Sequence, residues 1–169
     1  MVTKILSGII LSVALLPAQE VFPPLKASNL NGKEMAIPAE FEGDFNLVLI
    51  AFQRKQQDNV NTWLKPLPKI SEAHERLRYY ELPTIDKLNP ITRWFINNGM
   101  RSGIPDKTQR ARTITLYIDK RPFKTSLNLA AEDTIYALLL DRAGLVVWRA
   151  SGDYTEEKGK SLEQFLSGK

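Results

Sequence analysis

The residues best placed to do chemistry follow a continuous apolar run. Residues 47–52 (LVLIAF) are apolar throughout and predict a strand buried on both faces. The polar stretch 53–58 (QRKQQD) comes next, followed by Val60, Trp63 and Leu64 at the spacing of one helix face. At such a corner, the backbone N–H groups of a helix start can lower the pKa of a cysteine thiol. The 169-residue chain has no cysteine, which excludes thiol redox chemistry, disulfides and thiolate metal sites.

Other catalytic and metal-binding residues are equally sparse. His74 is the single histidine, so a site built from several histidines of one chain is excluded. Paired acids occur at 132–133 and 156–157, where a turn and a helix start explain them structurally. We therefore predict no metal, no cofactor and no catalytic residue, and a protein that is not an enzyme.

A binding role is the remaining option for the polar stretch. It follows the predicted central strand, and open α/β sheets bind ligands at the carboxyl ends of their strands. Gln53, Arg54 and Gln57 are candidate partner-binding residues, and Trp63 is the tryptophan best placed to add an apolar contact. The alternatives are that the stretch is an ordinary solvated loop and that Trp63, like the other two tryptophans, belongs to the core.

A second candidate surface is basic. Residues 101–112 have a loop-like composition and contain Arg101, Lys107, Arg110 and Arg112. Arg110 and Arg112 are further partner-binding candidates, and the set could contact an acidic protein or an anionic membrane weakly. Ordinary solvated surface charge is the alternative. The net charge of +4 is too small to indicate a nucleic-acid partner.

Strands and helices alternate along the chain and must position these candidates. Asn31–Gly32 predicts a hairpin turn near the N-terminus, and residues 141–144 predict another. Asn89–Pro90 is expected to open a helix that Gly99 ends. The result is an α/β domain with a mixed central sheet, helices on both faces and an N-terminal hairpin. The predicted strands are 47–52, 78–85, 113–118, 135–140 and 145–148, and the predicted helices are 59–65, one from Pro68, one from Asn89, 121–129 and 155–166.

Residues 1–18 have the composition of an export signal. Lys4 supplies a positive start, residues 5–16 are apolar, and cleavage is expected before Gln19. An uncleaved anchor or a buried helix is the alternative. We predict residues 19–169 as one domain, exported to the periplasm or the extracellular space, with or without membrane association.

Two segments carry a resemblance to the thioredoxin-like superfamily in its peroxiredoxin-type arrangement. Residues 117–123 (YIDKRPF) resemble the strand and helix start that peroxiredoxins place in mid-domain, and residues 138–145 (LLLDRAGL) resemble their closing hairpin. The resemblance implies the thioredoxin-like fold. It also implies a peroxidatic cysteine near Val60 and a supporting threonine near Gln57, and neither is present.

A narrower resemblance is to the mitochondrial ATP-synthase assembly factors. It rests on residues 52–54 (FQR) with 60–66 (VNTWLKP), and on residues 144–152 (GLVVWRASG). That family has a thioredoxin-like fold without thiol activity and acts as a chaperone for a membrane subunit of the ATP synthase. The resemblance implies an exported, non-catalytic binding protein with a protein partner, an assembly factor or chaperone for a membrane-protein complex. An enzyme of the same fold that uses non-thiol chemistry is the alternative.

Overall fold

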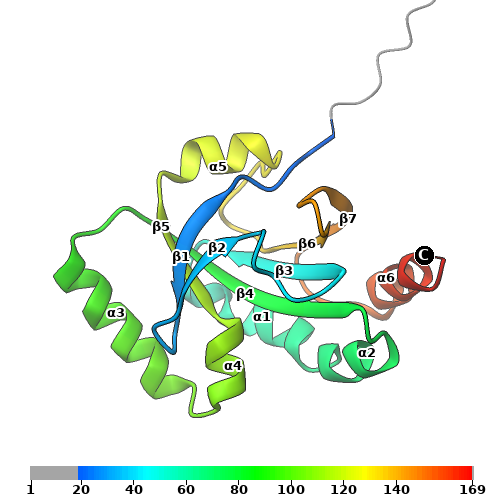
Figure 1. Cartoon of the computed structure of the whole chain (residues 1–169), viewed down its shortest axis with the longest axis horizontal. Helices are drawn as coiled ribbons and strands as arrows, with labels where there is room; N and C mark the ends of the chain where they lie inside the picture. The colour runs from blue at the N-terminus through cyan, green and yellow to red at the C-terminus, as the bar shows by residue number, and fades with distance from the viewer. Residues whose placement is uncertain (1–18, 169) are drawn as a thin grey trace, which may run out of the picture.

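A single mixed sheet of seven strands organises the domain (Figure 1). The structure is a computed structural model that describes residues 19–168, so the predicted export signal lies outside the described residues. The strand order is β2-β1-β5-β4-β3-β6-β7, in which β3, β4 and β5 run parallel and the other neighbours run antiparallel. The strands are β1 (Leu25–Asn29), β2 (Glu34–Ile37), β3 (Phe45–Ala51), β4 (Leu77–Asp86), β5 (Ile114–Ile118), β6 (Tyr136–Asp141) and β7 (Val146–Ser151).

The apolar run predicted as the central strand is β3, and it is buried on both faces as expected. Leu47 and Leu49 point into one core cluster, whereas Val48 and Ile50 point into the other. This division follows from the period of two along a strand, which sends successive side chains to opposite faces. From Leu47 to Ile50 each side chain enters one core or the other, which explains the uninterrupted apolar sequence of this run.

Helices cover both faces of the sheet. Residues of α1, α2 and α6 pack against Leu47 and Leu49, and Phe123 of α5 packs in the cluster on the opposite face. The N-terminal hairpin turns at Gly32, whose φ of 87° suits glycine, and Gly144 turns the closing hairpin with a φ of 80°. The helices are η1 (Arg54–Gln56), α1 (Gln57–Leu64), α2 (Leu67–Ala73), α3 (Pro90–Gly103), α4 (Lys107–Arg112), α5 (Lys120–Ser126) and α6 (Glu156–Ser167).

The structure corrects two predictions in the region after β4. Helix α3 begins at Pro90 as expected but continues through Gly99 to Gly103, because its last turns are tied to the domain: the Nε of Arg101 donates to the Leu30 carbonyl at 2.8 Å. Most of the stretch expected to be a loop is helical, since 101–103 end α3 and 107–112 form α4. Asp106 caps this helix by accepting from the backbone N–H groups of Thr108 and Gln109.

The core placement predicted for Trp94 is also wrong. Helix α3 contacts the sheet through a more polar face, where the Tyr117 hydroxyl donates to the Asn97 amide oxygen at 2.8 Å and the Arg93 guanidinium lies 5.0 Å from the centre of the Tyr117 ring. Trp94 lies on another face of α3 and is 60% exposed. Among the helices of residues 19–168, none is both long enough and apolar enough to cross a bilayer.

Candidate functional site

The corner that joins β3 to α1 is closed by side-chain amides. The Oε1 of Gln56 accepts from the backbone N–H groups of Phe52 and Gln53 at 2.8 and 3.0 Å. Its Nε2 donates to the carbonyl of Glu132 at 2.9 Å, and the Nε2 of Gln53 donates to the same carbonyl at 2.8 Å. Gln56 is 2% exposed, so these bonds are made in a buried environment. We call this arrangement the amide latch, formed by Gln53, Gln56 and the Glu132 carbonyl.

The latch changes the role of the predicted polar surface. Gln53 is half-buried, and its side-chain amide is hydrogen-bonded within the latch. The Nε2 of Gln57 lies within hydrogen-bond distance of Asn61 Oδ1, at 3.2 Å, and of Glu81 Oε2, at 3.4 Å. Of the predicted binding residues in this stretch, Arg54 and Gln57 are exposed, and Arg54 lies beside exposed Lys55.

Trp63 is a core residue, so its prediction as a contact residue is wrong. Its side chain is fully buried, and its Nε1 donates to the carbonyl of Gly152 at 2.9 Å. The ring packs edge-on against Tyr154 and Trp148, with centroid separations of 5.2 and 6.2 Å. The i, i+3 spacing from Val60 indicated this packing role in the sequence, because both residues occupy the face of α1 that meets the sheet.

Arg110 and Arg112, the two predicted basic contact residues, lie at the end of the parallel strands opposite to the corner between β3 and α1. The guanidinium of Arg112 lies over the Tyr79 ring at 4.4 Å, and Tyr79 pairs with Leu47 near the start of β3. Arg54 instead follows the carboxyl end of β3, so the structure does not bring it together with Arg112. Arg110 is half-buried and donates from Nη2 to the carbonyl of Pro105 at 3.3 Å.

Glu81 is a buried acid that the sequence interpretation missed. It lies in β4 with 4% of its surface exposed. The Nε2 of Gln57 and the Oγ1 of Thr113 both donate to its carboxyl oxygens at 3.4 Å. Burial raises the pKa of the Glu81 carboxyl above its ordinary value. The signal available in the sequence was an acid between the apolar residues of a predicted strand, at a position facing the helices.

Replacing Glu81 with glutamine is expected to change how stability depends on pH. The folded protein binds this proton at a higher pH than the unfolded chain, so wild-type stability should fall as pH rises from the unfolded-chain pKa through the raised pKa. Glu81→Gln removes this contribution and should be relatively more stable above the raised pKa. Urea unfolding over a pH series tests this, with the exposed Glu75→Gln as control. Parallel curves for wild type and Glu81→Gln would contradict the assignment.

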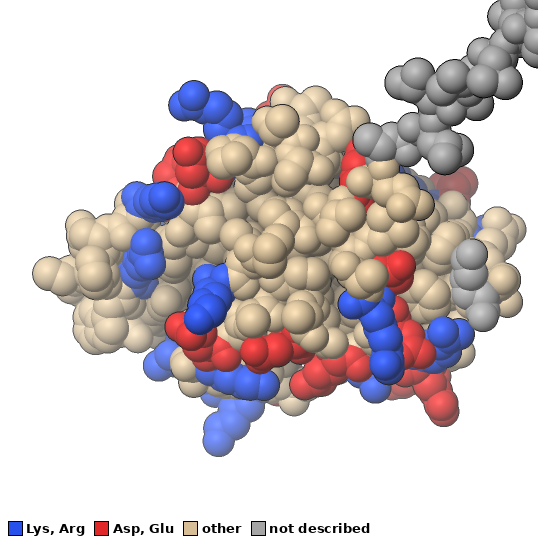
Figure 2. Space-filling view, turned by 45° about the horizontal axis from the view of Figure 1, so that its top comes forward, with Lys and Arg blue, Asp and Glu red and all other residues tan. Residues whose placement is uncertain are grey.

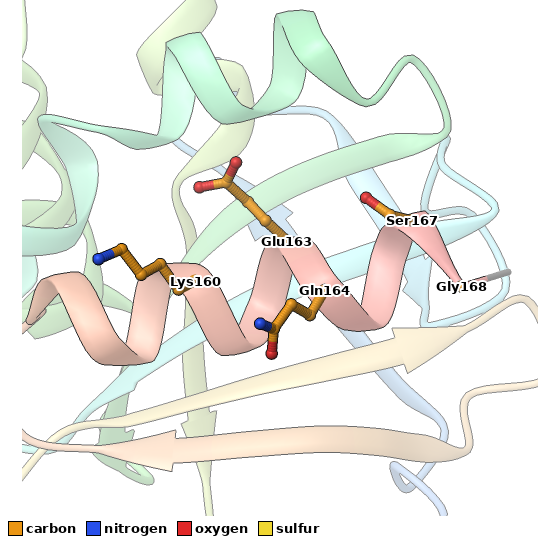
Figure 3. A pocket seen from close by; sticks show the side chains of 5 residues that line it. All are labelled: Lys160, Glu163, Gln164, Ser167 and Gly168. Carbon is orange, nitrogen blue, oxygen red and sulfur yellow. The ribbon is translucent and has the colours of Figure 1, made fainter.

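Neither of the two best-formed surface pockets within residues 19–168 is an enclosed binding site. The larger measures about 460 Å³, and Figure 3 shows that all of its lining residues come from α6 or the residue after it. A hollow made by one helix surface has no second wall to hold a ligand. A smaller pocket of about 270 Å³ is lined mainly by residues of the loop between β2 and β3. Within residues 19–168, no three histidine or acidic side chains gather in a way that could hold a metal ion.

Comparison with solved structures identifies the architecture. A thiol-disulfide oxidoreductase from Bacteroides fragilis has a TM-score of 0.55 and 14% identity, over 86% of this chain and 98% of that chain. The thioredoxin domain of a thiol-disulfide oxidoreductase from Bacteroides vulgatus has a TM-score of 0.57 and 16% identity, over 88% and 98%. The chain has the thioredoxin-like fold. The predicted fold class is therefore confirmed.

A third similar structure is BsSco, a member of the Sco family of cytochrome c oxidase assembly proteins. It has a TM-score of 0.58 and 14% identity, and the match covers 89% of this chain and 95% of that chain. No protein-family model matches the sequence, and neither does any curated protein.

The position of the amide latch can be compared with the position of the reactive cysteine in this fold. It lies at the strand-to-helix corner where the thioredoxin and peroxiredoxin folds keep a reactive cysteine. Val60, near which the resemblance to peroxiredoxins implied the peroxidatic cysteine, is an apolar side chain packed in the core beneath α1. This corner can therefore hold the chain together and present Arg54 and Lys55, but it supplies no thiol.

Proposed function

We propose that this protein is an exported, non-catalytic binding protein of the thioredoxin-like fold. In this proposal it is an assembly factor or chaperone for a membrane-protein complex, with the ATP synthase as the candidate complex. The observation that carries the proposal is the amide latch at the corner where the fold would otherwise hold a thiol, in a chain that has no cysteine. A closed polar corner on a rigid sheet suits recognition rather than redox turnover.

Two similarities support an assembly role. BsSco shows that a protein of this fold occurs in a family of cytochrome c oxidase assembly proteins. The resemblance to ATP-synthase assembly factors rests on two segments that meet in space, since Trp63 of the first packs against Trp148 of the second. That contact is internal, so it supports a similarity of fold. The choice of the ATP synthase as candidate partner rests on the sequence resemblance alone.

The partner is expected to contact the exposed part of the corner. Arg54 and Lys55 project from η1, directly after the central strand. A guanidinium offers several donors in a fixed plane and suits carboxylates or backbone carbonyls of a protein partner. The side chains of Gln53 and Gln56 are engaged in the latch and that of Gln57 contacts Asn61 and Glu81, so Arg54 is the residue at which contact is best detected.

The proposed absence of thiol catalysis is tested by measuring turnover of peroxide and of insulin disulfides. Activity equal to that of a heat-denatured sample is expected, because both reactions need a thiol. Turnover above that level would refute a non-catalytic role.

The partner is tested by photo-crosslinking in membranes that contain the ATP synthase. A photo-reactive amino acid replaces Arg54, and a control carries it in place of exposed Lys69 on α2. A membrane subunit of the ATP synthase should be captured from position 54 and not from position 69. Capture of a subunit of another membrane complex would reject the ATP synthase as partner, and capture from neither position would reject the corner as the binding site.

A further inference from the structure

Helix α3 presents an apolar face that the domain does not use. Ile91, Trp94 and Phe95 are 71%, 60% and 65% exposed, and they lie at the i, i+3, i+4 spacing of one helix face. Val21 is the one other large hydrophobic residue with a comparably exposed side chain in residues 19–168. The rings of Trp94 and Phe95 pack edge-on at 5.0 Å. We call these three residues the α3 apolar face.

This face is displayed by a well-formed helix. The Asn89 side chain caps α3 by accepting from the backbone N–H of Thr92 at 2.9 Å. Other residues of the helix anchor it to the domain, Asn97 through Tyr117 and Arg101 through the Leu30 carbonyl. No residue of α3 is fully buried. The apolar side chains therefore contribute little to the core, and their exposure costs free energy unless something covers them.

The segment that contains α3 and α4 carries an excess of positive charge. Residues 87–112 contain six basic residues and one acid, a balance of +5, compared with +4 for the whole chain. None of the six forms an ion pair within residues 19–168. Figure 2 shows the end of the molecule where α3 lies in Figure 1 as a largely uncharged surface with Lys and Arg side chains near its margin. The basic residues are Lys87, Arg93, Arg101, Lys107, Arg110 and Arg112.

Apolar side chains with a basic surround match one kind of surface particularly well. Tryptophan and phenylalanine favour the headgroup region of a bilayer, and lysine and arginine are attracted to anionic lipids. The core of a protein–protein interface is instead depleted of charged residues.

We propose that the α3 apolar face docks on an anionic bilayer surface. Ile91, Trp94 and Phe95 enter the headgroup region, while the exposed basic residues Arg101 and Lys107 lie near lipid phosphates. The helix lies on the membrane and does not span it. This surface is separate from the corner after β3, so the inference stands whether or not the proposed protein partner is correct.

Vesicle binding tests the proposal with the full chain. Vesicles of phosphatidylcholine mixed with phosphatidylglycerol are compared with vesicles of phosphatidylcholine alone, by flotation. Wild type should bind the anionic vesicles more tightly, and the triple variant Ile91→Ser, Trp94→Ser, Phe95→Ser should lose at least about tenfold in affinity. The variant Val21→Ser, which removes an exposed apolar side chain elsewhere, should bind like wild type. Every variant is made in the same full chain.

The contribution of the basic residues to vesicle binding is tested with two double variants. Arg101→Gln with Lys107→Gln should weaken binding to anionic vesicles and leave binding to neutral vesicles unchanged, with the larger effect at low salt. Lys26→Gln with Lys69→Gln removes two exposed charges from other elements and should have a smaller effect. Equal effects of the two pairs would overturn the role of the α3–α4 basic residues.

A local readout keeps the test valid even if the triple variant folds poorly. Trp94 is the exposed one of the three tryptophans, so lipids brominated near the headgroup should quench its fluorescence in wild type and quench Trp94→Phe much less. Absence of quenching at Trp94 would overturn the proposal. So would a concentration-dependent dimer that the triple variant loses, or binding to protein-containing membranes but not to pure lipid, because a second copy or a protein would then cover the face.

Discussion

Trp63→Ala is expected to lower the free energy of unfolding by about 3–5 kcal/mol, the usual range for truncating a large buried aromatic residue. The side chain is fully buried and packs edge-on against two other rings. Truncation also removes the donor to the Gly152 carbonyl. Loss of the ring opens a cavity between α1, β7 and the segment before α6, and the surrounding backbone can close it only in part. Urea unfolding monitored by circular dichroism measures the effect.

Trp94→Ala is the matched control for the same substitution on a different helix. Trp94 is exposed on α3, so its removal should change the free energy of unfolding by about 0.5 kcal/mol or less. A large loss of unfolding free energy in Trp94→Ala would mean that the α3 apolar face is packed against the domain. A small loss in Trp63→Ala would reopen the role of Trp63 as a contact residue.

The opposite positions of these two tryptophans show a limit of sequence interpretation. Each belongs to an apolar stripe at helical spacing, and such a stripe normally faces the core. In α1 the stripe meets the sheet. In α3 the face that meets the sheet is built from Arg93 and Asn97, whose partner Tyr117 is half-buried in a distant strand. The identity of that partner depends on the tertiary arrangement, which local periodicity does not contain.

The fold was more predictable than the site for a related reason. The apolar run of β3 and the glycine turns at Gly32 and Gly144 are local signals, and each produced the expected element. The amide latch joins Gln56 to a carbonyl 76 residues further along the chain. No spacing within 53–58 distinguishes Gln56, which is buried, from Gln57, which is exposed. The corner between β3 and α1 could therefore be located from the sequence, whereas the hydrogen bonds of the amide latch could not.

Leu49→Ala is expected to lower the free energy of unfolding by about 2–5 kcal/mol. Leu49 is fully buried in the central strand, where it pairs with Glu81 of β4 and Ala137 of β6. Leu25→Ala on β1 is the control, because Leu25 is half-buried and should cost clearly less. Equal costs would contradict the central position of β3.

Combining Leu49→Ala with Trp63→Ala gives a sharper test of the same core. Both side chains belong to the cluster between β3 and α1, so the two cavities are expected to share lining atoms and relax together. Residues that share a cavity show coupling energies of about 0.5–3 kcal/mol. The cost of the double variant should therefore differ from the sum of the single costs, whereas Val48→Ala with Trp63→Ala, which affects opposite faces of the sheet, should be closer to additive. Additivity in both pairs would mean that α1 does not pack on β3 through Trp63.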